Sequence, residues 1–312
     1  MTAHFRTIDD LNALVVASLE RIPRDVGLVV GIPRSGMLVA SLVALQLDLP
    51  LVDLRSFLEG RDAYGGRRDE QARRDADATR VLVVDDSVST GFEIRRVTAA
   101  LEEAGLRERA VLCAAYASNA GVDALDLHFE TLDAPQVFEW NWLHHPHLER
   151  MCLDLDGVLC RDARPEEDDD GERYREFLRS AEPRSLPSRP IGWLVTSRLE
   201  RYRPETEDWL ARHGVEVGEL VMMDVATREE RTGREIPFKA DAYRRSGAIL
   251  FVESAARQAE GIHERTGRPV FCTDTRRILD DRGGAHPLHR VRSRWTALRR
   301  RAGRWLRGRS RM

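Results

Sequence analysis

The sequence twice places a pair of acidic residues at the end of an apolar run of strand length. Asp85 and Asp86 follow VLVV, and Asp154 and Asp156 stand one residue apart at the end of MCLDLD. Such carboxylates suit the hydroxyls of a polyol, or a Mg²⁺ ion held beside a phosphate. Each half of the chain therefore presents a candidate site for a phosphorylated, magnesium-bound molecule.

A short loop rich in hydroxyl groups follows the first acidic pair and leads into a predicted helix. The start of a helix offers free N–H groups and the positive end of its dipole, which favour phosphate. The loop residues that offer a hydroxyl or a close backbone approach are Ser87, Ser89, Thr90 and Gly91. The alternative is a plain helix cap, because Thr90 and Glu93 have the spacing of a capping box. A cap alone leaves two adjacent carboxylates after four apolar residues unexplained.

These residues resemble the signature of the type I phosphoribosyltransferases, and a second match is GIPRSG at residues 31–36. The resemblance covers about residues 25–120. It implies that Asp85 and Asp86 contact the ribose of phosphoribosyl pyrophosphate (PRPP). It also implies that a cradle for the 5′-phosphate is formed by Ser87, Ser89, Thr90 and Gly91. The pyrophosphate loop would be formed by Arg34, Ser35 and Gly36. The charged loop 59–79 stands where the family has a flexible hood. Glu93 departs from the family, which has Ser or Thr there.

Further residues suited to phosphoryl transfer follow the second acidic pair. Asp154 and Asp156 are predicted to point to the same face of a strand, because side chains alternate along it. One carboxylate could act as nucleophile and the other as general acid and base, or the pair could simply form a turn. The later candidates are Thr196 at the end of the apolar strand WLVTSR, Lys239 at a predicted helix start, and Glu253 at the end of the strand ILFVES.

This order of residues resembles the four motifs of haloacid dehalogenase superfamily phosphatases, over about residues 150–275. The resemblance implies that Asp154 attacks phosphorus and that Asp156 protonates the leaving alkoxide. It implies that Thr196 and Lys239 stabilise the transferring phosphoryl group. It further implies that Mg²⁺ is held by Asp154, by the carbonyl of Asp156 and by Glu253.

Two features of this half bear on the resemblance. Lys239 is the only lysine among 49 basic residues, and an only lysine in the lysine position of the motif strengthens the match. The fourth motif departs, because many members have two acids where this chain has Glu253 and Ser254. About thirty residues separate Cys160 from Ile191, which is short for a cap domain and predicts an open site. The acidic run EEDDDG at 166–171, which lies within this segment, is interpreted as a solvated turn.

Strand-length apolar runs alternate with helical patterns, which is typical of parallel α/β sheets. Strands are expected at 27–31, 51–54, 81–84, 110–116, 151–155, 191–195, 219–223, 248–252 and 269–272, and helices at 37–47, 92–104, 172–180, 203–213, 238–246 and 254–266. We therefore expect an α/β chain with two parallel-sheet, Rossmann-like domains. The predicted divisions are a phosphoribosyltransferase-like domain at 1–147, a phosphatase-like domain at 148–282 and a basic tail at 283–312.

Composition limits the partners and the compartment. No apolar run approaches the roughly 18 residues of a membrane span, and four scattered cysteines favour a reducing cytoplasm. Residues 289–312 contain ten arginines and no acid, while the remainder has 39 basic and 52 acidic residues. Nucleic acid is therefore an unfavourable partner for the body of the protein. The tail spaces Trp295, Leu298, Ala302 and Trp305 as one apolar stripe, which suits a helix on an anionic membrane, although a nucleic-acid contact or a solubilising tail is also open.

The segment FEWNWLHHPH at 138–147 is interpreted as the joint between the two domains. Phe138, Trp140 and Trp142 alternate as on one face of a strand, and packing between domains is favoured over stacking on an acceptor base. The three histidines of the segment could bind a metal, but incidental histidines in a connecting loop are the favoured interpretation.

The leading hypothesis is a bifunctional enzyme. PRPP-dependent phosphoribosyl transfer, or its reverse, would be coupled to Mg²⁺-dependent hydrolysis of a phosphomonoester on a nucleotide or glycan precursor. The first alternative is a phosphatase whose front domain only senses PRPP or a nucleotide. The second is a scaffold without catalysis, held at a membrane by the tail. Transferases of this type are often dimers, so a homodimer is a further expectation.

Overall fold

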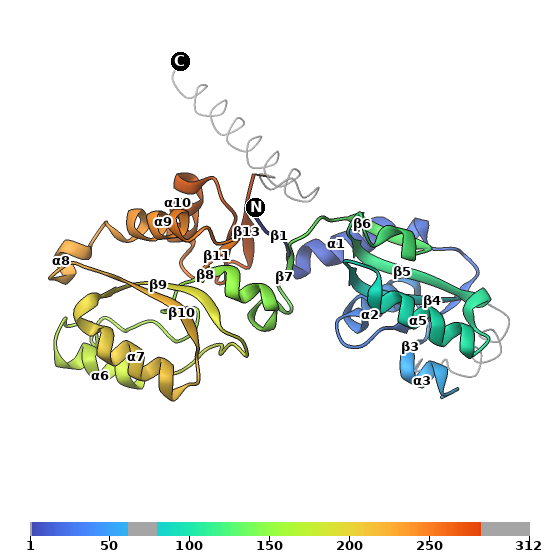
Figure 1. Cartoon of the computed structure of the whole chain (residues 1–312), viewed down its shortest axis with the longest axis horizontal. Helices are drawn as coiled ribbons and strands as arrows, with labels where there is room; N and C mark the ends of the chain where they lie inside the picture. The colour runs from blue at the N-terminus through green and yellow to red at the C-terminus, as the bar shows by residue number, and fades with distance from the viewer. Residues whose placement is uncertain (1, 62–79, 282–312) are drawn as a thin grey trace, which may run out of the picture. The chain divides into compact units, whose positions relative to one another are not determined.

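The computed structural model describes residues 2–61 and 80–281, so most of the hood loop and the whole basic tail lie outside the described residues. The described chain forms two compact units (Figure 1). We call His4–Trp140 the N-terminal unit, and Asn141 onward, together with the residues before His4, the C-terminal unit. The units divide seven residues before the predicted boundary.

The N-terminal unit is built on a five-stranded sheet in the order β3-β2-β4-β5-β6, and all of its neighbouring strands are parallel. A separate two-stranded parallel sheet pairs β1 (His4–Arg6) with β7 (Gln136–Phe138). The other elements are β2 (Val26–Gly31), β3 (Leu51–Asp53), β4 (Arg80–Val88), β5 (Ala110–Ala117), β6 (Leu127–Thr131), α1 (Ile8–Ser18), α2 (Gly36–Leu47), α3 (Leu54–Leu58) and α5 (Phe92–Glu103).

Helices cover both faces of this sheet. One core joins Leu82 and Val84 of β4 to the apolar residues of α1 and α2. The other joins Val81 and Val83 of the same strand to α5. Because alternate residues of β4 enter different cores, both of its faces are buried, which explains its continuous apolar sequence.

The C-terminal unit has a six-stranded sheet in the order β10-β9-β8-β11-β12-β13. Its elements are β8 (Met151–Leu153), β9 (Ile191–Leu199), β10 (Val217–Met223), β11 (Leu250–Glu253), β12 (Val270–Cys272), β13 (Arg277–Leu279), α6 (Glu172–Ser180), α7 (Arg203–Arg212), α8 (Arg228–Arg231), α9 (Glu235–Ser246) and α10 (Ala256–Thr266). Figure 1 shows α9 and α10 on one side of this sheet and α6 and α7 on the other. Tyr243 and Ile262, from α9 and α10, pack on Phe251 of β11 in one core.

Each large sheet contains one point where the strand order reverses. In the N-terminal unit the chain passes from β2 to β3 on one side and then continues through β4 on the other. In the C-terminal unit β9 and β10 lie on one side of β8, and β11 and β12 lie on the other. Ligands of open α/β sheets bind beside the carboxyl ends of the strands at such reversal points. The loops after β2, β4, β8 and β11 are therefore the expected ligand-binding loops.

The α/β class is confirmed, and the sheet of the N-terminal unit is parallel as expected. The sheet of the C-terminal unit is mixed, because β13 runs antiparallel to β12. This edge hairpin was not predicted, since the segment TDTRRILDD lacks a long apolar run. The acidic run is not simply solvated: Asp168 forms ion pairs with Arg228 and Arg231, and Asp170 accepts a hydrogen bond from the Tyr202 hydroxyl. Within the described residues, none of the helices is long and apolar enough for a membrane span.

Candidate functional sites

The loop after β2 lies against the end of β4. Gly36, the first residue of α2, has no room for a side chain: a Cβ there would lie 2.6 Å from the carbonyl oxygen of Val84 and 3.0 Å from Oδ1 of Asp85. The predicted pyrophosphate loop, Arg34–Gly36, is thus brought next to the first predicted ribose contact. The Pro33–Arg34 peptide bond within the same loop is cis.

The two acids of β4 have different surroundings. The strand continues to Val88 instead of ending at the acids, so Asp85 and Asp86 point to opposite faces. Asp86 is buried on the face that carries the core of α1 and α2, and its Oδ2 accepts a hydrogen bond from Trp140 Nε1 at 2.8 Å. Asp85 is half-buried, and its Oδ1 accepts the N–H of Asp86 at 2.8 Å. Burial, with the neighbouring Asp86 charge, raises the pKa of Asp85 to about 8.

The predicted phosphate cradle is shorter than expected. Ser87 belongs to β4, where it is the partner of Tyr116, so the loop consists of Ser89, Thr90 and Gly91. Ser89 and Thr90 are exposed, and Gly91 takes a φ of 74°, the left-handed conformation that favours glycine. A Cβ at Gly91 would also lie 2.7 Å from an Arg95 guanidinium nitrogen.

The capping-box alternative does not hold at this loop. Gly91 occupies the N-cap position of α5, and no side chain caps the helix. Glu93 forms an exposed ion pair with Arg96 at 3.3 Å instead of reaching back to the cap. The N-cap residue of α5 thus offers its first N–H groups no side-chain acceptor, and such groups favour an anion.

The second predicted site is centred on Lys239. Its Nζ lies 2.8 Å from Asp154 Oδ2 and 2.7 Å from Glu253 Oε2, and all three side chains are buried. The N–H of Asp154 donates to the Val252 carbonyl at 2.9 Å, which holds the chain after β8 beside β11. Lys239 is the fifth residue of α9, because this helix begins at Glu235 and not at the predicted 238. The sequence thus brings Asp154, Lys239 and Glu253 together at the strand reversal.

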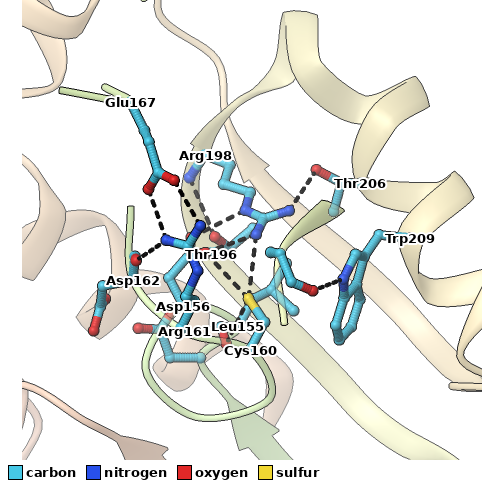
Figure 2. Close-up of polar contacts among 12 residues, drawn as sticks. Leu155, Asp156, Cys160, Arg161, Asp162, Glu167, Thr196, Arg198, Thr206 and Trp209 are labelled. Carbon is cyan, nitrogen blue, oxygen red and sulfur yellow. Dashed lines mark hydrogen bonds and ion pairs between the residues drawn. The ribbon is translucent and has the colours of Figure 1, made fainter. Parts of the chain in front are cut away.

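The side chain of Asp156 is bound by Arg198, an arginine that was not among the predicted site residues. Arg198 Nε and Nη2 donate to the two oxygens of Asp156 at 3.0 and 2.6 Å (Figure 2). Arg198 is fully buried, and a third guanidinium nitrogen donates to the Thr206 hydroxyl at 3.3 Å. The motif WLVTSR contains this arginine, but β9 continues past Thr196 to Leu199, so the predicted strand end hid it.

Charge and burial act differently on the two aspartates. Burial raises the pKa of Asp154 well above its usual range, and the Glu253 charge raises it further against the opposing effect of Lys239. Burial alone would raise the pKa of Asp156 as well, but the Arg198 ion pair brings it below its usual range. The Arg198 ion pair thus favours the carboxylate form of Asp156, and the general-acid role that the resemblance implied for it stays a prediction.

Thr196 and Ser254 complete the polar surroundings of the site. Thr196 is fully buried and its hydroxyl accepts the N–H of Arg198 at 3.2 Å. The Ser254 hydroxyl donates to the Asp156 carbonyl at 3.3 Å, at the position where the fourth motif was expected to have a second acid. A Cβ at Gly157 would lie 2.2 Å from that hydroxyl oxygen, and Gly157 has a φ of 78°, so only glycine fits this turn.

The donor set bears on whether Mg²⁺ could be held here. Within residues 2–61 and 80–281, no three histidine, cysteine, aspartate or glutamate side chains form a metal-binding group. Arg198 occupies both side-chain oxygens of Asp156, which leaves its main-chain carbonyl as the oxygen that the predicted ligand set draws from this residue. Three acidic side chains face Lys239 and Arg198, so the cluster has no excess of positive charge that would repel a cation. Asp154 and the Asp156 carbonyl fit an ion that takes its other ligands from water and substrate, as Mg²⁺ usually does.

Three charged residues beside Gly157 were not predicted. Arg184 donates to the Gly157 carbonyl at 2.6 Å and lies 3.8 Å from Asp274. A Cβ at Gly157 would lie 3.1 Å from Asp162 Oδ2. Burial and the charge of Asp156 raise the pKa of Asp162. These residues come from loops without a recognisable motif, so their sequence offered no signal.

The aromatic segment behaves as two separate parts. Phe138 and Trp140 stack with ring centroids 4.7 Å apart in the N-terminal unit, whereas Trp142 lies in the C-terminal unit with its ring 6.3 Å from that of Phe271. The three aromatics therefore do not share one strand face. The His145 and His147 rings lie 4.6 Å apart, and His144 bonds the Ser188 hydroxyl, so the histidines do not converge on one point.

Comparison with known proteins finds similarity in the region that contains the first site. A search of curated proteins gives no match. Solved structures similar to this chain include the purine phosphoribosyltransferase of Pyrococcus horikoshii, at 18% identity over 45% of this chain and 94% of that chain, with a TM-score of 0.34. Another is the xanthine-guanine-hypoxanthine phosphoribosyltransferase of Helicobacter pylori, at 16% identity over 45% and 92%, with a TM-score of 0.34. Residues 3–146, which include the loops after β2 and β4, match the family model of the phosphoribosyl transferase domain.

Proposed function

We propose that the N-terminal unit transfers the phosphoribosyl group of PRPP to an acceptor, or catalyses the reverse. The family match on residues 3–146 supports transferase chemistry. The observation that carries the proposal is Gly36, whose missing side chain lets the loop after β2 approach Val84 and Asp85 within contact distance. Pyrophosphate would lie on Arg34–Gly36, the ribose near Asp85 and Asp86, and the 5′-phosphate on Ser89–Gly91 and the open start of α5.

Calorimetric titration of the full chain with PRPP and Mg²⁺ tests this proposal. Asp86→Asn should weaken PRPP binding at least tenfold, since a hydrogen bond to a charged group contributes about 1.5–3 kcal/mol. Asp9→Asn, the same change at an exposed position on α1, is the matched control and should bind normally. Release of pyrophosphate with a panel of purine and pyrimidine bases would then identify the acceptor. Absence of PRPP binding by the wild-type chain would refute the transferase proposal.

A second activity is favoured by the Lys239 cluster. We infer that the C-terminal unit hydrolyses a phosphomonoester. Asp154 would attack phosphorus as the bond to the leaving alcohol breaks, the alkoxide would take a proton from water, and a second water would release phosphate from the aspartyl phosphate. Lys239 and Thr196 would stabilise the transferring group. A bound Mg²⁺ ion would neutralise the phosphoryl charge, and Asp154, Glu253 and the Asp156 carbonyl would be the residues that hold it. Lys239 holds the carboxylates of Asp154 and Glu253 in place, so the nucleophile is already oriented at the sheet edge.

Phosphate release from p-nitrophenyl phosphate and from nucleoside 5′-monophosphates tests the second activity. Asp154→Asn should abolish Mg²⁺-dependent release, whereas Asp241→Asn, an exposed position on α9, should leave it unchanged. If the wild-type chain binds PRPP but hydrolyses no phosphomonoester, the coupled enzyme is wrong and the transferase alone remains. Hydrolysis without PRPP turnover would instead favour a front domain that senses its ligand.

Together the two activities would give net ribosylation. Phosphoribosyl transfer leaves a 5′-phosphate on its product, and hydrolysis of that phosphomonoester would draw the sequence forward. A nucleotide or glycan precursor carrying such a phosphate is the expected intermediate class. Progress curves that show free phosphate appearing only after pyrophosphate would support this order.

A further inference from the structure

Trp140 makes a specific contact with one of the proposed ribose-binding acids. Its indole N–H donates to Oδ2 of Asp86 at 2.8 Å, across 54 positions of sequence. Asp86 is 4% exposed, so this hydrogen bond is made away from bulk water. Bonds from a donor to a buried carboxylate are stronger than those between neutral groups.

The indole ring belongs to a layer of stacked aromatic side chains. Its ring stacks on Phe138 at 4.7 Å and 12°, and Phe138 stacks on Tyr116 at 5.2 Å. Tyr116 belongs to β5, where it pairs with Ser87 at the end of β4. The aromatic layer is thus built on the strands that carry the acid.

The backbone beside Trp140 is also fixed. Phe138 is the register partner of Arg6 in the small sheet, and the N–H of Glu139 donates to the Arg6 carbonyl at 3.0 Å. A Glu139 carboxylate oxygen accepts the N–H of Ile8 at 2.8 Å, which ties the same segment to the start of α1. The donor therefore has a single defined place relative to β4.

From these contacts we infer that Trp140 is a positioning residue for the PRPP site. By binding one oxygen of Asp86 it fixes the plane of the carboxylate and thereby the direction in which the second oxygen meets the ribose hydroxyls. This role rests on the proposed transferase function. We place the pyrophosphate on a different loop, Arg34–Gly36 at the start of α2, where the nearest side-chain atom to a Cβ at Gly36 would be Oδ1 of Asp85.

Trp140→Phe is the direct test, because it keeps an aromatic ring for stacking and removes only the N–H donor. PRPP and ribose 5-phosphate should bind about tenfold more weakly or worse, given the strength of a hydrogen bond to a charged group. Inorganic pyrophosphate should bind as it does to the wild-type chain. Trp193→Phe is the matched control, since the Trp193 indole N–H donates to the Glu219 carboxylate at 3.0 Å in the C-terminal unit.

A double-variant cycle separates positioning from packing. In an Asp86→Asn background, Trp140→Phe should cause little further loss, because the carboxylate that the indole orients is already gone. If Trp140→Phe folds poorly, nitrogen-15 indole spectra of the wild-type chain provide the second measurement. The indole resonance that moves in Asp86→Asn should also move on adding ribose 5-phosphate and should stay in place with pyrophosphate.

Three results would overturn the inference. If the wild-type chain binds PRPP and Trp140→Phe binds it with the same affinity, the positioning role is refuted and the transferase proposal stays intact. Equal losses for PRPP and pyrophosphate would show a general structural effect. Failure of the wild-type chain to bind PRPP would refute the proposed function itself.

Discussion

Replacing Lys239 with methionine removes the only cation between two buried carboxylates. Lys239, Asp154 and Glu253 keep 2%, 6% and 0% of their side-chain surfaces exposed, so water cannot take over the role of the ammonium group. Removal of one partner from a buried ion pair costs about 3–5 kcal/mol. Because about 2–4 °C accompanies each kcal/mol in a unit of this size, the melting temperature of the C-terminal unit should fall by roughly 6–20 °C.

The pH dependence of this variant follows from Asp154. Burial and Glu253 already raise its pKa in the folded chain, and loss of Lys239 removes the main opposing charge. The folded variant therefore binds a proton that the unfolded chain has released, so its stability falls as pH rises above the ordinary pKa of an aspartate. The deficit relative to the wild-type chain should be larger at pH 8 than at pH 5.

Differential scanning calorimetry of the full chain would measure this loss, because it separates the transitions of the two units. Combining Lys239→Met with Glu253→Gln removes one of the two stranded charges and should recover part of the loss. If the free energy of unfolding of Lys239→Met lies within about 1 kcal/mol of the wild-type value at pH 8, the three side chains do not form the buried ion pairs described above.

Three further predictions follow from other contacts. Asp85, with its pKa raised to about 8 from 3.8, should make the chain less stable as pH rises between these values, and urea unfolding of Asp85→Asn should lack this slope. Gly157→Ala should lower the free energy of unfolding by about 1–3 kcal/mol, because the new methyl group overlaps the Ser254 hydroxyl, and a Ser254→Gly background should restore part of it. Arg198→Met should lower the free energy of unfolding by about 3 kcal/mol, the lower end for a broken buried ion pair, because the Asp156 side chain is 24% exposed. Adding Asp156→Asn should reduce this loss, as measured by chemical denaturation.

The sequence predicted the elements that rely on continuous apolar runs. The strands around 27–31, 81–84 and 110–116 and the helix at 172–180 lie where the pattern placed them. Strand ends were less accurate. In β4, Asp85 and Ser87 still pair with β5, and β9 runs on to Leu199, which pairs with β10 after a shift in register. Hydrophobic pattern marks where a strand is buried and does not mark where its backbone pairing stops.

The candidate sites were predictable to different depths. Asp154, Lys239 and Glu253 converge as their order at strand and helix ends suggested, since parallel strands end at a common sheet edge. The partners of the aspartates were not predictable. Arg198 and Trp140 reach Asp156 and Asp86 over 42 and 54 positions, and such contacts depend on packing that no local spacing encodes.

The single lysine has a practical consequence for anyone who handles this protein. Because the only side-chain amine of the sequence is 1% exposed, reagents selective for primary amines find no lysine on the folded surface. Coupling through such chemistry should therefore spare the body of the folded chain. Acylation of Lys239 would require the C-terminal unit to open, so the rate of acylation at this residue would measure how often that opening occurs.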